Sequence, residues 1–283
     1  MSVKNVIKQF LPRRYDHPYS KEVGQRVLLT FGLQRSGQHL VIDWICRGLQ
    51  EAIHLNNCYF QRHGFSYILT PGKRKIRIYS STSQHGRVAY KLKDVGRHKI
   101  ESKAPSSLPK TLLYSVEDKK ILNKSFLKLI YSHPTTVLII LRDPANWLAS
   151  TLHRGVSTKR QILDNIPIFC EYLDLSTSEK SPLSNIDFLT VNYNIFINDS
   201  DYRMQLFKLL GLYDRKSAED SLKVIPEFGG GSSFKEEISS YNRHERWKYY
   251  VNDNFFQEIL RNERLIHLSK CYFGELPGLD EWG

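Results

Sequence analysis

The sequence predicts a three-layer α/β protein, in which helices cover both faces of a doubly wound, mainly parallel sheet. Segments with strand composition alternate with segments of helical periodicity, the order from which parallel sheets are built. Residues 136–141 form a continuous apolar run with several β-branched side chains, which is typical of a central strand buried on both faces. Residues 27–45 read as an apolar strand, a short polar loop and an apolar-faced helix.

The remaining elements follow from the same patterns along the chain. Strands are expected at 27–32, 88–92, 111–115 (ending towards 118), 136–141 and 187–193, with a short hairpin or insertion within 56–90. Helices are expected at 36–50, 119–131, 145–154 and 200–211, followed by one or two closing helices within 244–270. Pro134 ends the second of these helices, and Gly211 is placed to cap the fourth. Residues 229–234 are expected to form a glycine-rich loop.

The length of 283 residues suits one α/β domain over 27–283, with an insertion at about 56–110. Residues 1–26 are expected to form a basic amphipathic helix and a linker. Its helical part, 3–11, is interpreted as a lid packed on the domain, with contact to a membrane surface as the alternative.

Composition restricts the class of protein. No run approaches the roughly 20 apolar residues that span a bilayer, and the N-terminus lacks the apolar stretch of a secretory signal. The four cysteines are scattered and have no Cys-x-x-Cys spacing, so no metal site is expected and a cytoplasmic location is predicted. The formal net charge of +12 favours an anionic ligand, a nucleic acid or an acidic membrane face. No nucleic-acid-reading motif accompanies that charge.

The loop between Gly32 and His39 has the architecture of an anion site. Main-chain N–H groups at the start of a helix point at one place, and the helix dipole adds partial positive charge there. A nucleoside-triphosphate loop places Lys and then Ser or Thr after its second glycine. Here Gln38 and His39 follow Gly37, and the cation, Arg35, precedes it. The pattern favours an anion bound without a metal, and an ordinary strand–helix turn is the alternative.

A second motif follows the strongest strand and reads Arg142-Asp-Pro-Ala-Asn-Trp-Leu-Ala-Ser150. Ligands of open α/β sheets collect at the carboxyl ends of strands, and the guanidinium of Arg142 offers a planar fork for phosphate. Alternatively, Arg142 pairs with a carboxylate and Pro144 simply starts the next helix.

Together the two motifs resemble the PAPS-dependent sulfotransferase superfamily, which has a P-loop NTPase-like fold. Its 5′-phosphosulfate loop has Lys or Arg before Ser-Gly, and its 3′-phosphate motif has Arg and Ser eight residues apart, as Arg142 and Ser150 are. Two later parts of the chain are also similar: 188–193, ending in Tyr193, followed by 206–211, and then 232–234 followed by the arginine-containing segment 243–248. The resemblance implies PAPS (3′-phosphoadenosine 5′-phosphosulfate) as the donor. It implies that the donor is bound by Gln34, Arg35, Ser36, Gly37, Gln38, His39, Arg142, Ser150, Tyr193, Ser232, Ser233, Phe234, Arg243 and Arg246.

The chain departs from the family pattern at several of these positions. Gln38 and His39 stand where cytosolic members commonly have threonines, and Asn194 replaces an acidic residue. The Arg-Lys-Gly triplet is absent, so Arg243 and Arg246 are assigned by position alone.

Sulfuryl transfer requires a stabiliser of the leaving group and a base for the acceptor's proton. Arg35, helped by loop N–H groups, Gln38 and His39, is expected to stabilise the leaving oxygen. Members of the family use His or Glu as the base, and Glu117 is the best match. Its alternative role is a first-turn helix carboxylate favoured by the dipole. The other candidate bases are His39, His85, His98 and Lys93.

The sequence therefore predicts an enzyme that moves a sulfuryl group from PAPS to a hydroxyl or amine acceptor without a metal. Aromatic and basic residues within 59–79 favour a carbohydrate or glycoconjugate acceptor, and a small metabolite is the alternative. A nucleotide-dependent kinase and a non-catalytic nucleotide-binding protein are the alternatives of another class.

Overall fold

The computed structural model describes residues 26–49, 52–56, 76–80, 88–92, 111–122, 135–155, 157–178, 187–223 and 245–276. The predicted N-terminal helix at 3–11, the loop at 229–234 and most of the helix expected at 119–131 lie outside these residues. The four residues 119–122 are not helical.

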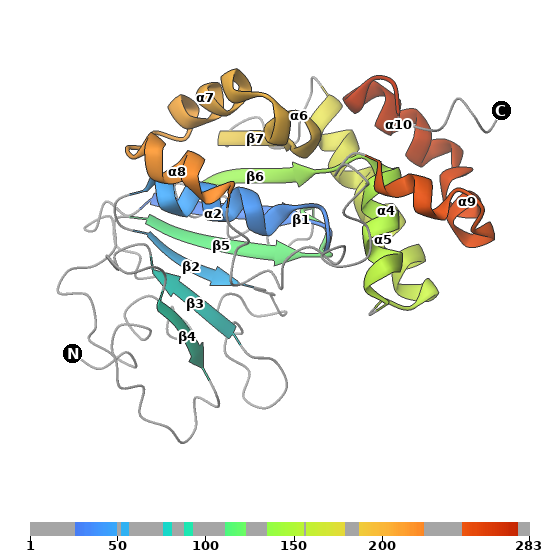
Figure 1. Ribbon diagram of the computed structural model, residues 1–283, viewed down its shortest axis with the longest axis horizontal. Helices are drawn as coiled ribbons and strands as arrows, with labels where there is room; N and C mark the ends of the chain where they lie inside the picture. The colour runs from blue at the N-terminus through green and yellow to red at the C-terminus, as the bar shows by residue number, and fades with distance from the viewer. Residues whose placement is uncertain are drawn as a thin grey trace.

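Within the described residues, seven strands form one sheet in the order β4-β3-β2-β5-β1-β6-β7 (Figure 1). The strands are β1 (Arg26–Gly32), β2 (Ala52–Asn56), β3 (Ile76–Ser80), β4 (Val88–Leu92), β5 (Thr111–Glu117), β6 (Thr135–Leu141) and β7 (Asp187–Asn192). The five adjacent strands from β2 to β7 are all parallel, whereas β3 is antiparallel to both β2 and β4. The prediction of a mainly parallel α/β fold is confirmed.

Helices cover both faces of this sheet. One apolar cluster joins the sheet to α2 (Gln38–Gly48), α6 (Tyr193–Asn198), α7 (Ser200–Leu209) and α8 (Arg215–Ser221). The other joins it to α4 (Pro144–Arg154), α5 (Lys159–Thr177), the 3-10 helix η3 (Arg246–Tyr250), α9 (Asn254–Leu260) and α10 (Glu263–Phe273). Alternate side chains of β1 enter the two clusters, with Leu28 on one face and Leu29 on the other. The three expected layers are therefore present.

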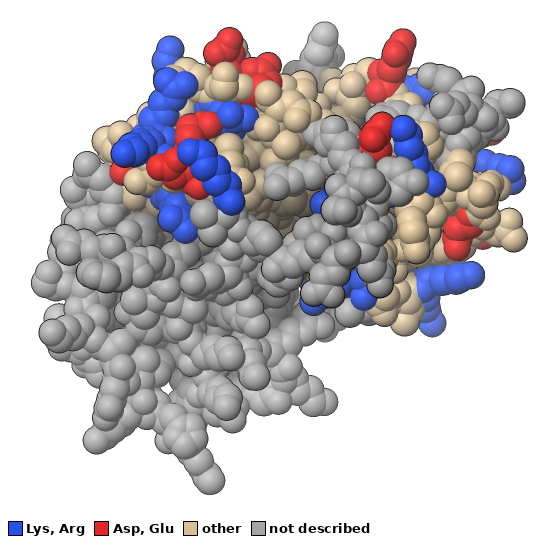
Figure 2. All heavy atoms as spheres, in the orientation of Figure 1, with Lys and Arg blue, Asp and Glu red and all other residues tan. Residues whose placement is uncertain are grey.

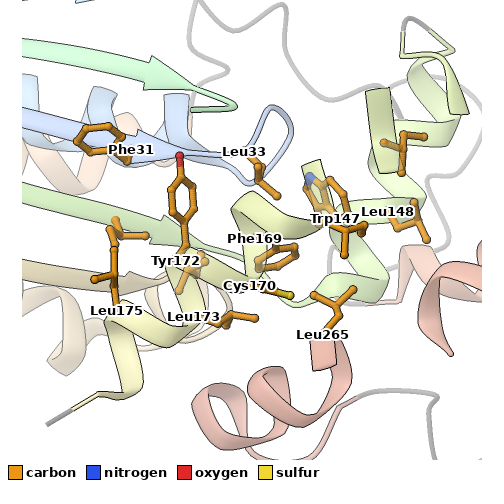
Figure 3. Packing of buried hydrophobic residues seen from close by; sticks show 14 of the residues in the cluster. Phe31, Leu33, Trp147, Leu148, Phe169, Cys170, Tyr172, Leu173, Leu175 and Leu265 are labelled. Carbon is orange, nitrogen blue, oxygen red and sulfur yellow. The ribbon is translucent and has the colours of Figure 1, made fainter. Parts of the chain in front are cut away.

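Aromatic side chains fill the second of these clusters close to the strand ends. Trp147 of α4 meets Phe169 of α5 edge to face, with ring centroids 5.2 Å apart. Phe31 of β1 meets Tyr172 of α5 at 6.5 Å. Figure 3 shows that these rings pack between the sheet and the helices, with Trp147 beside the loop that follows β1. Two helices are thereby fixed beneath the loop.

Several predicted elements occur with shifted bounds. The strand expected to reach Tyr193 ends at Asn192, because the Asn192 side chain accepts the main-chain N–H groups of Asn194 and Ile195 and starts α6. The closing helices within 244–270 are three short elements. Asp253 and Asn262 cap α9 and α10 in the same way, which interrupts a continuous helix.

Four elements have no counterpart in the sequence prediction. They are β2, α5, α6 and α8. The 19-residue α5 carries a capping box, in which Thr158 accepts from the N–H of Gln161 and the Gln161 side chain accepts from the N–H of Thr158. That spacing is visible in the sequence and marks the start of the helix. No helix that the structure describes is long and apolar enough to cross a membrane.

Candidate functional site

Strand register brings the predicted motifs to one edge of the sheet. Gly32 at the end of β1 is opposite Glu117 at the end of β5 and Ile140 near the end of β6. Leu141 of β6 is opposite Asn192, the last residue of β7. The residues that follow these positions, including Arg142 and Tyr193, therefore leave the sheet at the same carboxyl-end edge, where open α/β sheets bind ligands.

The loop between β1 and α2 needs both of its glycines. Gly37 has a φ of 86°, and a Cβ there would lie 2.1 Å from the Tyr193 ring. A Cβ on Gly32 would lie 2.9 Å from Ser36 Oγ and from Gln38 Oε1. Arg35 also lies in the left-handed region, with a φ of 75°. The loop is a tight, partly strained turn closed over by an aromatic ring.

Two polar side chains of the loop are buried, and they differ in whether they have a hydrogen-bond partner within the protein. Gln38 is buried, and its Nε2 donates to Thr30 O at 3.3 Å and to Thr30 Oγ1 at 3.2 Å. The side chain of Gln38 thus ties α2 to β1, and only its main-chain N–H remains suited to the predicted role at the anion. Ser36 is 2% exposed, and its Oγ has no hydrogen-bond partner among the described residues.

Three arginine side chains influence one another around this loop. Burial lowers the pKa of Arg35, and the positive charges of Arg154 and Arg142 lower it further, while Glu117 and Tyr193 oppose them. Arg142 is 3% exposed, and its Cζ lies 5.3 Å from the centroid of the Tyr193 ring. Arg154, in the last turn of α4, was not predicted, although its place four residues after Ser150 puts both on one helix face.

The segment that carries Arg142 is held at its turn into α4. Asp143 caps the helix by accepting from the N–H of Asn146 at 2.8 Å, and Pro144 occupies the first helical position. Asn194 Nδ2 donates to Asp143 Oδ2 at 3.0 Å. An acidic residue at 194 would repel Asp143, so the departure from the family pattern at Asn194 has a physical reason here.

Glu117 and His39 lie side by side at the end of β5. His39 Nε2 is 3.4 Å from Glu117 Oε1, and the side chains are 25% and 12% exposed. Burial, followed by the charge of Asp118, raises the pKa of Glu117 to about 7, against the opposing effect of Arg35. Glu117 ends a strand and is not a first-turn helix residue, because residues 118–122 are not helical. A carboxylate with this pKa can accept and return a proton near neutral pH.

A buried histidine on β2, the strand next to β5, contacts β5 close to Glu117. His54 of β2 is completely buried, and its Nε2 lies 2.9 Å from Ser115 Oγ of β5. Burial and the nearby charge of His39 lower the pKa of His54. The sequence prediction missed His54 because β2 was not predicted, and its five residues carry too short a pattern to indicate a strand.

The other predicted residues have these positions. Ser150 is 1% exposed within α4, and Arg246 begins η3, which packs on α4. Outside the described residues lie Ser232, Ser233, Phe234 and Arg243, and the candidate bases His85, His98 and Lys93. Among the residues that are described, no group of three or more His, Cys, Asp or Glu side chains could hold a metal ion.

No family model matches the chain, and no curated protein matches it. Any function must therefore be inferred from the geometry of the residues at the strand ends.

Proposed function

We propose that this protein is a sulfotransferase, which moves a sulfuryl group from PAPS to a hydroxyl or amine acceptor in the cytoplasm. The observation that carries the proposal is the gathering of Arg35, Arg142 and Arg154 around the loop that starts α2. Arg154 and Arg142 lower the pKa of Arg35 against the opposing effects of Glu117 and Tyr193, and a bound anion would add to that opposition.

The chemistry of the site fits the donor. PAPS carries negative charge at its 5′-phosphosulfate and at its 3′-phosphate, and two separate arginine motifs reach this edge. Arg35 and the first turn of α2 would hold the phosphosulfate, and Arg142 with Ser150 would hold the 3′-phosphate. The buried, unpartnered Oγ of Ser36 supports an oxygen-rich ligand at the loop, since a buried hydroxyl without a partner is costly.

The residues at the end of β5 supply the proton chemistry. Glu117 accepts the proton of the acceptor hydroxyl as its oxygen bonds to sulfur. The bond between sulfur and the bridging phosphate oxygen breaks, and adenosine 3′,5′-bisphosphate leaves. Arg35 and the N–H groups at the start of α2 stabilise the charge that grows on that oxygen. Glu117 has a pKa of about 7, so a large share of the molecules carry it ionised at neutral pH.

The acceptor that we propose is a carbohydrate or glycoconjugate, because aromatic and basic residues are interleaved within 59–79. Rings of this kind stack on sugars, and the cations pair with acidic groups. Of this segment the structure describes only 76–79, at the outer antiparallel part of the sheet.

Transfer of ³⁵S from labelled PAPS to a panel of sugars, glycoconjugates and small hydroxylated metabolites tests the activity. We expect the wild type to label at least one acceptor. In Glu117→Gln the rate of transfer should fall by roughly 10²–10⁴-fold, while nucleotide binding persists. Full activity in Glu117→Gln would show that a residue other than Glu117 is the general base. No transfer to any acceptor, with bisphosphate still bound, would favour a non-catalytic nucleotide-binding protein.

A further inference from the structure

We propose that Asp118 is a positioning residue, which holds the main-chain N–H of Gln34 and with it the backbone that leads into Arg35 in the orientation that the anion site requires. Asp118 follows Glu117 directly, on the turn that leaves β5. Neither composition nor the motifs single it out. The inference rests on the proposed function only for its consequence at the nucleotide.

The main chain of Gln34 is held on both sides of its Cα. Its N–H donates to Asp118 Oδ1 at 2.9 Å. Its carbonyl accepts from the indole Nε1 of Trp147 at 3.0 Å, and Trp147 is 1% exposed in the core beneath the loop (Figure 3). The two peptide groups that flank Gln34 thereby connect the end of β5, the loop and the start of α4, which carries the Arg142 motif.

Strain at two neighbouring points agrees with this role. Arg35 and Asp118 are the non-glycine residues with positive φ in the described part of the chain, at 75° and 54°. Such a conformation is unfavourable for a non-glycine residue and persists where surrounding contacts impose it. The N–H of Asp118 donates to Gly32 O at 3.2 Å, so each turn fixes the other.

The carboxylate of Asp118 also acts on the neighbouring Glu117. Its negative charge is, after burial, a cause of the raised pKa of Glu117. The groups facing Glu117 are His39 of α2, Arg35 of the loop and Tyr172 of α5. Those facing Asp118 are Lys119, Asn165 of α5 and Tyr172. The Asp118 side chain therefore holds the loop backbone and, after burial, contributes to the raised pKa of Glu117.

Two substitutions separate these effects. Asp118→Asn keeps an acceptor for the Gln34 N–H and removes the charge, whereas Asp118→Gly removes both and tolerates the left-handed backbone. Asp214→Asn is the matched control, because Asp214 likewise accepts a main-chain N–H, that of Ser217 at 2.9 Å, where it caps α8.

Amide hydrogen exchange of Gln34 and the carboxyl titration of Glu117 are the readouts, both measured by NMR without nucleotide. We expect Gln34 to exchange at least about tenfold faster in Asp118→Gly and near the wild-type rate in Asp118→Asn and Asp214→Asn. The Glu117 midpoint should fall in both Asp118 variants, because a negative neighbour is lost. Unchanged Gln34 exchange in Asp118→Gly, or an unchanged midpoint in Asp118→Asn, would overturn the inference.

Calorimetric titration with adenosine 3′,5′-bisphosphate then measures the consequence at the nucleotide. The Kd should rise about 10-fold or more in Asp118→Gly and stay near the wild-type value in Asp118→Asn. If the wild type fails to bind, the proposed function fails, while exchange and titration still decide the role of Asp118. Equal binding by wild type and Asp118→Gly would contradict a role in positioning the anion loop.

Discussion

At the scale of single residues, Arg35 combines an unfavourable backbone conformation with the nearby positive charges of two other arginines. Its backbone is left-handed, and burial, followed by the charges of Arg154 and Arg142, lowers the pKa of its side chain. Under the proposed function, an anionic ligand at the loop would balance these charges. Arg142 is the more deeply buried partner and packs on the Tyr193 ring.

Arg142→Ala should weaken binding of adenosine 3′,5′-bisphosphate by about 1.5–3 kcal/mol, the usual loss for a hydrogen bond to a charged group. Isothermal titration calorimetry measures the change. Arg142→Lys, which keeps the charge and loses the planar fork, should fall between wild type and alanine. Unchanged affinity in Arg142→Ala would show that Arg142 does not contact the nucleotide.

The raised pKa of Glu117 makes stability depend on pH. Between about 4.5 and about 7 the folded state holds a proton that the unfolded state has lost. Its contribution to stability is present in full below the lower value and is lost as pH rises through about 7. Urea unfolding should therefore show a fall of up to about 3 kcal/mol from pH 4.5 to 8 that Glu117→Gln lacks. Parallel curves for the two proteins would show that Glu117 has an ordinary pKa.

At the scale of elements, the loop between β1 and α2 can adopt its conformation because it has glycine at positions 32 and 37, where neighbouring side chains leave no room for a Cβ. The Tyr193 ring at the start of α6 closes directly over Gly37. This ring contacts the loop on one side and Arg142 on another. The side-chain amide of Gln38 fastens the following helix to β1, a role for which threonine is too short.

Gly37→Ala tests this packing, with Gly155→Ala as its control. Both glycines have positive φ, 86° and 63°, but a Cβ on Gly155 meets nothing within 4 Å. Gly155→Ala should cost about 1 kcal/mol of unfolding free energy from backbone strain alone. Gly37→Ala should cost more, because the Tyr193 ring must move, and it should also weaken nucleotide binding. Equal losses in the two variants, measured by urea unfolding, would show that Tyr193 does not close over Gly37.

At the scale of the whole molecule, a sheet with helices on both faces brings together residues more than 100 positions apart in sequence, as Trp147 and Gln34 are. The surface of the described part carries charges of both signs. Figure 2 shows Lys and Arg interspersed with Asp and Glu over α7 and α8, as in the pair of Lys223 with Asp220. In that view the described residues form no single basic stripe of the kind that binds nucleic acid.

Local patterns predicted the parts of the fold with strong signals. The run at 136–141 is β6, all of whose residues are buried, and the glycine loop leads from β1 to α2. Because the carboxyl ends of parallel strands lie at one edge of a sheet, these patterns were enough to predict that Arg35, Glu117 and Arg142 lie at the same edge. The short β2 lacks such a signal, whereas α5 was not predicted although its capping box is visible in the sequence, and the helix continues through Pro167. His54 was missed because β2 was not predicted, and Arg154 was missed because its effect on Arg35 depends on a loop distant in sequence.

The central claim is that the β1–α2 loop holds a sulfated or phosphorylated adenosine without a metal. The most direct measurement is the shift in melting temperature with adenosine 3′,5′-bisphosphate in the absence of Mg²⁺, compared with ATP plus Mg²⁺. We predict the larger stabilisation with the bisphosphate, because a ligand that binds the folded state raises its stability by an amount that grows with the logarithm of its affinity. A larger shift with ATP plus Mg²⁺ would contradict the account and favour a nucleotide-dependent kinase.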